Sequence, residues 1–156
     1  MNFADINGIS IHFNYNNNGA NKPTVVFSNS LGTDFRIWES CIENLSKDYS
    51  ILTYDKRGHG LSGLGNSPYV INDHVTDLID LMDHLKISEA VLVGLSVGGL
   101  VVQGVYHKRP DLVQGLILCD TAAKIGNEQM WNDRIAIARD GGLEALLEGN
   151  MQRWFS

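Results

Sequence analysis

The residues best suited to chemistry are the segment Gly94-Leu95-Ser96-Val97-Gly98. It follows a short apolar run and leads into a second apolar run with helical spacing, so a strand, a sharp turn and a helix are predicted. The two glycines give strand and helix room to approach each other. We therefore predict that Ser96 is a catalytic nucleophile and that the Val97 N–H, at the start of the helix, faces the developing negative charge. The alternative is a glycine-rich turn with an incidental serine.

The elements around this turn alternate between strands and helices, which predicts a mostly parallel sheet with helices on both faces. Asn7-Gly8 lies between two strand-like runs and predicts an opening hairpin. The helix from residue 71 has its apolar positions on one face, and Asn72 or Asp73 could cap it. The expected strands are residues 3–6, 9–15, 24–27, 51–54, 90–93 and 113–118, and the expected core helices are residues 37–45, 71–85 and 97–109.

The pattern changes after Asp120, where two amphipathic stretches follow without a strand between them. These are residues 129–139 and 143–151, separated by Gly141-Gly142. Because no strand separates them, these two helices are unlike the rest of the α/β pattern, and we predict that they belong to a cap over the ends of the strands. We therefore divide the chain into an α/β core, residues 1–122, and the start of a helical cap, residues 123–156.

Composition excludes several classes of partner. The 156 residues carry a formal net charge of -6, whereas nucleic acid or an anionic membrane calls for a basic face. Cys41 and Cys119 lack C-x-x-C spacing, so a zinc site and a disulfide framework are not indicated, and we expect buried thiols. The N-terminus has no basic segment followed by an apolar core, which predicts a cytoplasmic protein.

Six segments together resemble an α/β-hydrolase, and more closely the 3-oxoadipate enol-lactonases of aromatic catabolism. The segment around Ser96 alone indicates only the α/β-hydrolase superfamily. The other five segments narrow the resemblance to the lactonase group. They are FSNSLGT (27–33), YDKRGHG (54–60), GLSVGG (94–99), DTAAKIG (120–126), MWNDR (130–134) and RWF (153–155).

The resemblance implies a serine hydrolase that opens the enol-lactone to 3-oxoadipate without a metal or organic cofactor. Ser96 corresponds to the family nucleophile and Val97 to the oxyanion donor after it. The second donor should be a backbone N–H in the loop after residues 24–27, for which we choose Ser30, with Leu31 as the neighbouring alternative. Arg134 and Trp131 are the candidates to bind the substrate carboxylate. Lys124 is a weaker alternative, and the competing interpretation is that Arg134 is a solvated residue and Trp131 a packing residue.

The family's general base and acid come from beyond the cap, and no histidine of this chain occupies that place. The chain has His12, His59, His74, His84 and His107. His59 is the only plausible substitute for the base, and Asp120 could substitute for the acid, although both are better explained as loop residues. We interpret Asp55 and Arg57 as a pair that fixes the glycine-rich loop.

Because the general base and acid are missing, we predict that this chain is the N-terminal portion of a lactonase and is nearly inactive alone. We also expect residues 113–118 to form an uncovered, apolar edge of the sheet. The missing half of the enzyme, or a second copy of the chain, would cover that edge. Two other functions remain open. One is a carboxylesterase of the same fold, and the other is a catalytically inactive interaction module.

Overall fold

The computed structural model describes residues 2–19 and 22–155, apart from the side chain of Arg153. Its contacts divide the chain into two compact units, Met1–Ala123 and Lys124–Ser156. The first unit is built on a six-stranded sheet with the order β1-β2-β4-β3-β5-β6. The strands are β1 Asn2–Ile6, β2 Ile9–Asn16, β3 Thr24–Ser28, β4 Ser50–Tyr54, β5 Ala90–Leu95 and β6 Val113–Cys119.

The hairpin at the start of the sheet forms as predicted. Asn7 and Gly8 have φ values of 51° and 75°, the left-handed conformations that a two-residue hairpin turn requires. β2 pairs antiparallel with both β1 and β4, while β3, β4, β5 and β6 pair in parallel. The prediction of a mostly parallel α/β sheet is therefore confirmed.

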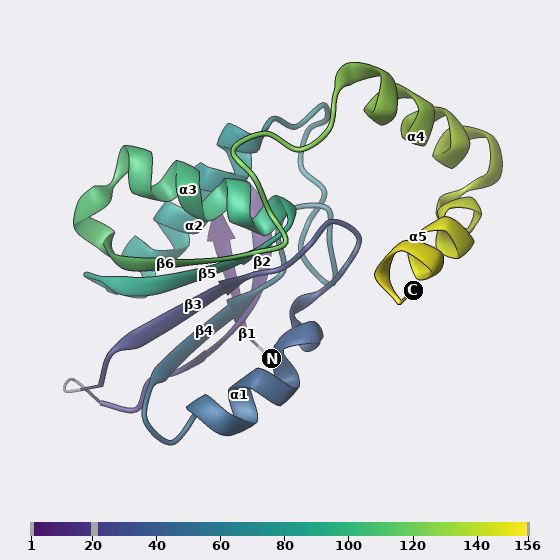
Figure 1. Cartoon of the computed structure of the whole chain (residues 1–156). Coiled ribbons are helices and arrows are strands. Elements are labelled where there is room, and N and C mark those ends of the chain that lie inside the picture. The colour runs from purple at the N-terminus through teal and green to yellow at the C-terminus, as the bar shows by residue number, and fades with distance from the viewer. Residues whose placement is uncertain (1, 20–21, 156) are drawn as a thin grey trace. The chain divides into compact units, whose positions relative to one another are not determined.

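Helices cover both faces of the sheet (Figure 1). Alternate residues of the parallel strands point to opposite faces, so that Val26 and Leu92 contribute to one core and Phe27 and Val93 to the other. α2 (Ile71–His84) and α3 (Val97–Lys108) cover the first core. The short 3-10 helix Phe35–Trp38 and α1 (Glu39–Leu45) cover the second, where Trp38 packs against Phe27 with ring centroids 4.8 Å apart.

α2 begins at Ile71, as predicted, but its N-cap residue is not one of the two predicted. Val70 is the N-cap residue, and the Asp73 carboxylate reaches back to accept a hydrogen bond of 2.8 Å from the Val70 N–H. Neither Asn72 nor Asp73 is therefore the N-cap itself. The predicted apolar face is present, with Val75, Leu78 and Met82 buried against the sheet.

β6 forms one edge of the described sheet, as predicted, and it exposes apolar side chains. Ile117 is 51% exposed and Leu118 is 46% exposed. The 3-10 turn Pro110–Leu112 connects α3 to this strand. Within the described residues, β6 pairs only with β5 and leaves its outer edge open.

Asp55 and Arg57 do not pair with each other, so the predicted pairing is wrong, although Asp55 does fix the glycine-rich loop by accepting from the Leu61 N–H at 3.0 Å. Arg57 instead forms a two-pronged ion pair with Asp77 of α2, at 2.6 Å from Nε and 2.7 Å from Nη2. Asp55 accepts from His12 of β2 at 2.8 Å. The partners lie on neighbouring elements because β2 and α2 pack beside the end of β4, an arrangement that sequence spacing does not reveal.

Replacing Arg57 with methionine is expected to lower the free energy of unfolding by about 3 to 5 kcal/mol, because the buried Asp77 carboxylate loses its cation. Asn7, whose amide donates to Asp77 at 3.0 Å, cannot neutralise that charge. Urea unfolding of the variant measures the loss. The double variant Arg57→Met with Asp77→Leu should recover most of it. An Arg57→Met variant as stable as the unmodified chain would contradict the argument.

The second unit is helical, with α4 (Glu128–Gly141), the 3-10 turn Leu143–Leu146 and α5 (Leu147–Trp154). The second predicted stretch therefore begins as a 3-10 turn rather than an α-helix. Asn127 caps α4, since its side chain accepts from the Met130 N–H at 2.9 Å. None of the described helices is long and apolar enough to cross a membrane.

The two cysteines do not meet the expectation of buried thiols. Cys41 is exposed on α1 and Cys119 is half-buried at the end of β6, and both are free thiols. No residue of α1 is fully buried, so the position of Cys41 on this helix does not place its thiol in the core.

Candidate active site

Ser96 lies at the sharp turn between β5 and α3. Its backbone has φ 54° and ψ -117°, a conformation that non-glycine residues adopt only where the surroundings enforce it. Val97 is the first residue of α3. The first N–H groups of a helix have no partner within it, so the Val97 N–H is available to an external acceptor. The turn thus presents a hydroxyl beside a free backbone donor.

Two glycines permit this turn because the neighbouring backbone leaves no room for a side chain. A Cβ on Gly94 would lie 2.6 Å from the carbonyl oxygen of Gly98, and a Cβ on Gly98 would overlap the carbonyl oxygen of Ser28. Ser28 ends β3 and precedes the predicted oxyanion loop. The start of α3 and this loop are therefore in direct backbone contact.

Replacing Gly98 with alanine is expected to destabilise the first unit by at least about 2 kcal/mol, because the obstructing atoms belong to backbone and cannot rotate away. Thermal or urea unfolding measures the change. Gly115→Ala is the matched control, since no atom lies within 4 Å of the Cβ it would add. Equal stability of the two variants would show that the close approach of Gly98 to Ser28 is absent.

The segment after β6 supports the turn from a second direction. The Thr121 hydroxyl donates to the carbonyl oxygen of Ser96 at 2.7 Å, and the Ser96 N–H donates to the carbonyl oxygen of Cys119 at 3.0 Å. Gln103 of α3 also donates to the carbonyl oxygen of Ala122, at 3.2 Å. Three hydrogen bonds therefore tie the last residue of β6 and the segment after it to the turn and its helix. Thr121 belongs to the DTAAKIG segment, but nothing in that pattern specified its partner.

The oxyanion loop follows β3 and contains Ser30, the predicted second donor. The carbonyl oxygens of Asn29 and Ser30 accept from Lys56 Nζ, at 2.6 Å and 3.1 Å. Asn29 also donates through its side chain to Thr33. Throughout the described ranges, the Ser30 and Leu31 N–H groups have no protein acceptor. Either one is therefore available to a ligand.

Lys56 is a site residue that the sequence reasoning missed. It is only 1% exposed, and burial lowers the pKa of its ammonium group to about 7, with the Asp55 carboxylate opposing part of this effect. A lysine two residues after a buried strand was the available signal. Its targets could not be read from the sequence because they are backbone carbonyls on a different loop.

The histidines within the described residues form no hydrogen bond with Ser96. His59 Nδ1 lies 3.0 Å from the carbonyl oxygen of Arg57, and burial lowers its pKa. Burial, assisted by the positive charge of Lys56, lowers the pKa of His74 to about 4. His12 pairs with Asp55, beside a pocket of about 500 Å³. The described residues thus supply a candidate nucleophile and candidate oxyanion donors, but no histidine that is hydrogen-bonded to Ser96 as a general base.

Trp131 and Arg134, the predicted substrate-binding residues, both lie on α4 in the second unit. Trp131 donates through Nε1 to the carbonyl oxygen of Ile125 at 2.9 Å. Arg134 donates through Nη2 to the Asn150 side chain at 2.8 Å. Ser96, Val97 and the oxyanion loop are held together in the first unit.

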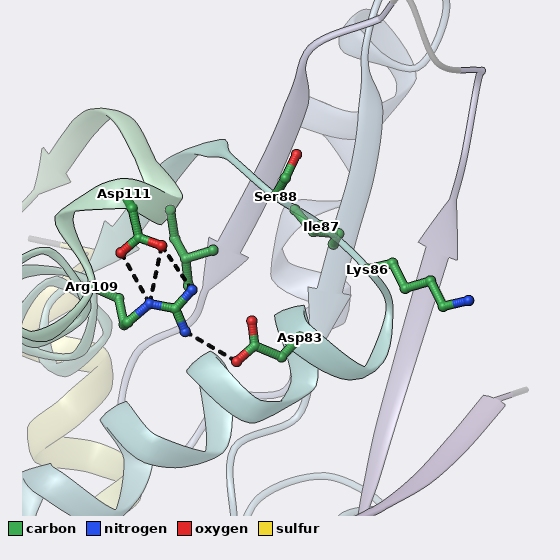
Figure 2. Close-up of a pocket in the computed structure, with 7 residues that line it drawn as sticks. Asp83, Lys86, Ile87, Ser88, Arg109 and Asp111 are labelled. Carbon is green, nitrogen blue, oxygen red and sulfur yellow. Dashed lines mark hydrogen bonds and ion pairs between the residues drawn. The ribbon is translucent and has the colours of Figure 1, made fainter.

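A second hollow, of about 270 Å³, lies where α2 and α3 end, and charged residues line it (Figure 2). Arg109 donates to Asp111 at 2.8 Å and to Asp83 at 3.1 Å, so its charge is engaged by two carboxylates. Lys86 extends away from Arg109 in this view. This arrangement holds the ends of α2 and α3 together. Among the residues described, no group of three or more acidic, histidine or cysteine side chains could hold a metal ion.

Comparison with known proteins gives one family and close lactonase relatives. The protein family described as alpha/beta hydrolase fold matches residues 23–152 of this chain. A 3-oxoadipate enol-lactonase of Acinetobacter baylyi is 39% identical over 137 residues, which are 88% of this chain and 51% of that protein. A second lactonase of the same organism is 35% identical, over 90% of this chain and 52% of its own length.

The solved structure of the enol-lactonase from Burkholderia xenovorans matches 99% of this chain and 60% of its own, with a TM-score of 0.94 and 39% identity. The chain spans about half the length of the curated relatives that it matches. The family match covers most of the sequence, and the sheet order and the turn at Ser96 agree with it. This chain therefore belongs to the α/β-hydrolase fold family.

Proposed function

We propose that this chain supplies the nucleophile and oxyanion donors of a serine hydrolase that opens 3-oxoadipate enol-lactone to 3-oxoadipate. The observation that carries the proposal is the backbone at Ser96, enforced at φ 54° between β5 and the first N–H of α3. Such a turn exposes a hydroxyl beside a preorganised donor. The lactonase names of the relatives at 39% and 35% identity support the choice of substrate.

In the proposed reaction, the Ser96 hydroxyl oxygen attacks the lactone carbonyl carbon while a base accepts the proton. The Val97 N–H and the Ser30 or Leu31 N–H stabilise the negative oxygen of the tetrahedral intermediate. The bond from the acyl carbon to the ring oxygen then breaks, and the base gives its proton to that oxygen, which leaves as an enol that converts to the ketone. Water then attacks the acyl-enzyme; its hydroxyl becomes part of the product acid, and its other proton passes through the base to Ser96. With serine as nucleophile, backbone N–H groups as oxyanion donors and a general base for proton transfer, these steps require no metal or organic cofactor.

We place the general base and its acid on a segment that corresponds to the unmatched half of the relatives. The open edge of β6, with its exposed Ile117 and Leu118, is the surface on which that segment, or a second copy of this chain, would pair. The inactivity of the chain by itself follows from this proposal, because a hydrolase without its base retains only a small part of its rate enhancement.

The free carboxylate of the substrate needs a cation in a protein of negative net charge. We propose Arg134 for this role, with Trp131 beside it on the same helix as part of a substrate-covering cap. A guanidinium can hold a carboxylate in two-pronged geometry, which suits a substrate of defined orientation. We place the enzyme in the cytoplasm, and the free thiols Cys41 and Cys119 support that compartment.

The test is the mass and activity of the native protein purified from its source, with the enol-lactone and a simple aryl ester as substrates. We expect lactone hydrolysis from a species that contains more polypeptide than this chain. Preference for the aryl ester would favour a carboxylesterase. A native protein that neither hydrolyses the lactone nor reacts with a fluorophosphonate probe at Ser96 would be an inactive interaction module and would overturn the proposal.

A further inference from the structure

Lys56 is buried at the end of β4 and directs its charge at backbone rather than at an acid. Its Nζ lies 2.6 Å from the carbonyl oxygen of Asn29 and 3.1 Å from that of Ser30. No carboxylate among the described residues forms an ion pair with it. A buried ammonium group is costly unless its protons are bonded, so these two carbonyls are what hold Lys56 in place.

This arrangement fixes the direction of two N–H groups. In a planar trans peptide the C=O and N–H bonds point in opposite directions, and neither peptide of this loop is cis. Because the Asn29 carbonyl faces Lys56, the Ser30 N–H points away from it. Because the Ser30 carbonyl also faces Lys56, the Leu31 N–H points away as well. These are the two groups from which the second oxyanion donor was predicted.

The ammonium charge also strengthens both donors. A cation beside a carbonyl oxygen polarises the peptide and makes its N–H a better donor, and this effect is larger in a buried site. The loop cannot easily turn to escape this orientation, because Ser28 is packed against the backbone of Gly98 and the Asn29 side chain is bonded to Thr33.

We propose that Lys56 is a positioning residue of the oxyanion hole, holding the Asn29–Ser30 and Ser30–Leu31 peptides so that their N–H groups face the reacting carbonyl. This inference rests on the proposed function. Lys56 itself touches neither substrate nor nucleophile. Its effect on the reaction passes through the two peptides.

The proposal has a pH signature, because burial lowers the pKa of Lys56 to about 7. The charged groups that act on it or respond to it are Asp55 beside it, His59 in the glycine-rich loop, and His74 on α2. Both histidines have pKa values below their ordinary 6.5. Deprotonation of Lys56 can therefore be followed above pH 7, beyond the range in which these two histidines titrate.

The first measurement follows the Ser30 and Leu31 amide resonances by 15N–1H NMR in the 156-residue chain between pH 5.5 and 9. We expect both to move with a midpoint near 7, together with the Lys56 ε-carbon signal. Lys56→Met should abolish this step, Lys56→Arg should hold the low-pH positions throughout, and Lys108→Met, at an exposed lysine of α3, should leave the step intact. Amides that do not follow Lys56, or that still titrate in Lys56→Met, would overturn the proposal.

The second measurement is kcat/KM for the enol-lactone in the native active species. We expect Lys56→Met to lower it about 10- to 100-fold through kcat, and Lys56→Arg to restore most of the loss, since removal of a whole donor costs about 10²- to 10³-fold. An unchanged kcat in Lys56→Met would overturn this proposal and leave the lactonase function standing. An unmodified protein without activity would overturn the lactonase function, and the NMR titration would still decide the placement of the peptides. If Lys56→Met fails to fold, the unmodified chain and Lys56→Arg decide both measurements.

Discussion

Replacing Ser96 with alanine is expected to lower kcat/KM for the enol-lactone by about 10⁴-fold or more in the intact active species, whatever polypeptides that species contains. The variant keeps the Val97 and oxyanion-loop donors but has no atom to form the acyl-enzyme. Loss of a nucleophile therefore removes the covalent route entirely, whereas loss of one donor costs only part of the barrier reduction. The fold should be unaffected, since alanine is smaller and the backbone of the turn is held by Thr121 and Cys119.

Two readouts make this test specific. Turnover of the lactone reports the whole reaction, and labelling by a fluorophosphonate followed by peptide mass analysis reports the reacting side chain. Ser88→Ala is the matched control, because Ser88 is exposed and lines the hollow in Figure 2, where no reaction is proposed. Ser96→Ala that retains turnover or labelling would assign the nucleophile to another residue and remove the basis of the proposed mechanism.

Local patterns predicted the elements of this fold well. The Asn7-Gly8 turn, the apolar face of α2 and the strand, turn and helix around Ser96 each depend on residues close together in the chain. Hairpin geometry and helical periodicity act over a few residues, so that a single sequence contains the necessary information. The same holds for the α/β class, which follows from the order of the elements.

Contacts between distant segments were not predictable from these patterns. Asp55 and Arg57 are two residues apart, yet their partners are His12 and Asp77, on β2 and α2. The sheet order decides the first pairing, because it brings β2 beside β4, whereas the second depends on the position of α2. A charge pattern shows which residues need a partner, and only the packed structure shows which partner they find.

Lys56 illustrates the same difference at the candidate site. The sequence shows a lysine within YDKRGHG, and we assigned it no role from the sequence. The structure buries it because β4 ends inside the first unit, beneath the loop after β3. Its function then depends on the orientation of backbone carbonyls, about which residue types give no information.

A buried lysine also predicts how the stability of the chain varies with pH. Lys56 has a pKa of about 7 in the folded chain and 10.5 when exposed to water, so between these values the unfolded chain binds more protons than the folded chain. Raising the pH then favours folding. We expect the free energy of unfolding to rise between pH 7 and pH 10 by about 3 to 4 kcal/mol, since each pH unit contributes at most about 1.4 kcal/mol.

Other groups act in different pH windows. The lowered pKa of His74, about 4, makes stability rise between pH 4 and 6.5, where the unfolded histidine is charged and the folded one is neutral. Burial raises the pKa of Tyr54, so its contribution is lost above pH 10, where the unfolded tyrosine ionises. The interval from pH 7 to pH 10 therefore reports mainly on Lys56.

Urea unfolding at intervals of half a pH unit measures this slope, and Lys56→Met isolates its cause. The variant should be nearly independent of pH across the interval, because methionine carries no proton in either state, while Lys108→Met should keep the slope of the unmodified chain. A slope that survives in Lys56→Met would mean that Lys56 is hydrated in solution. The oxyanion loop would then need another explanation for the direction of its peptides, since a hydrated ammonium group would gain nothing by facing the Asn29 and Ser30 carbonyls.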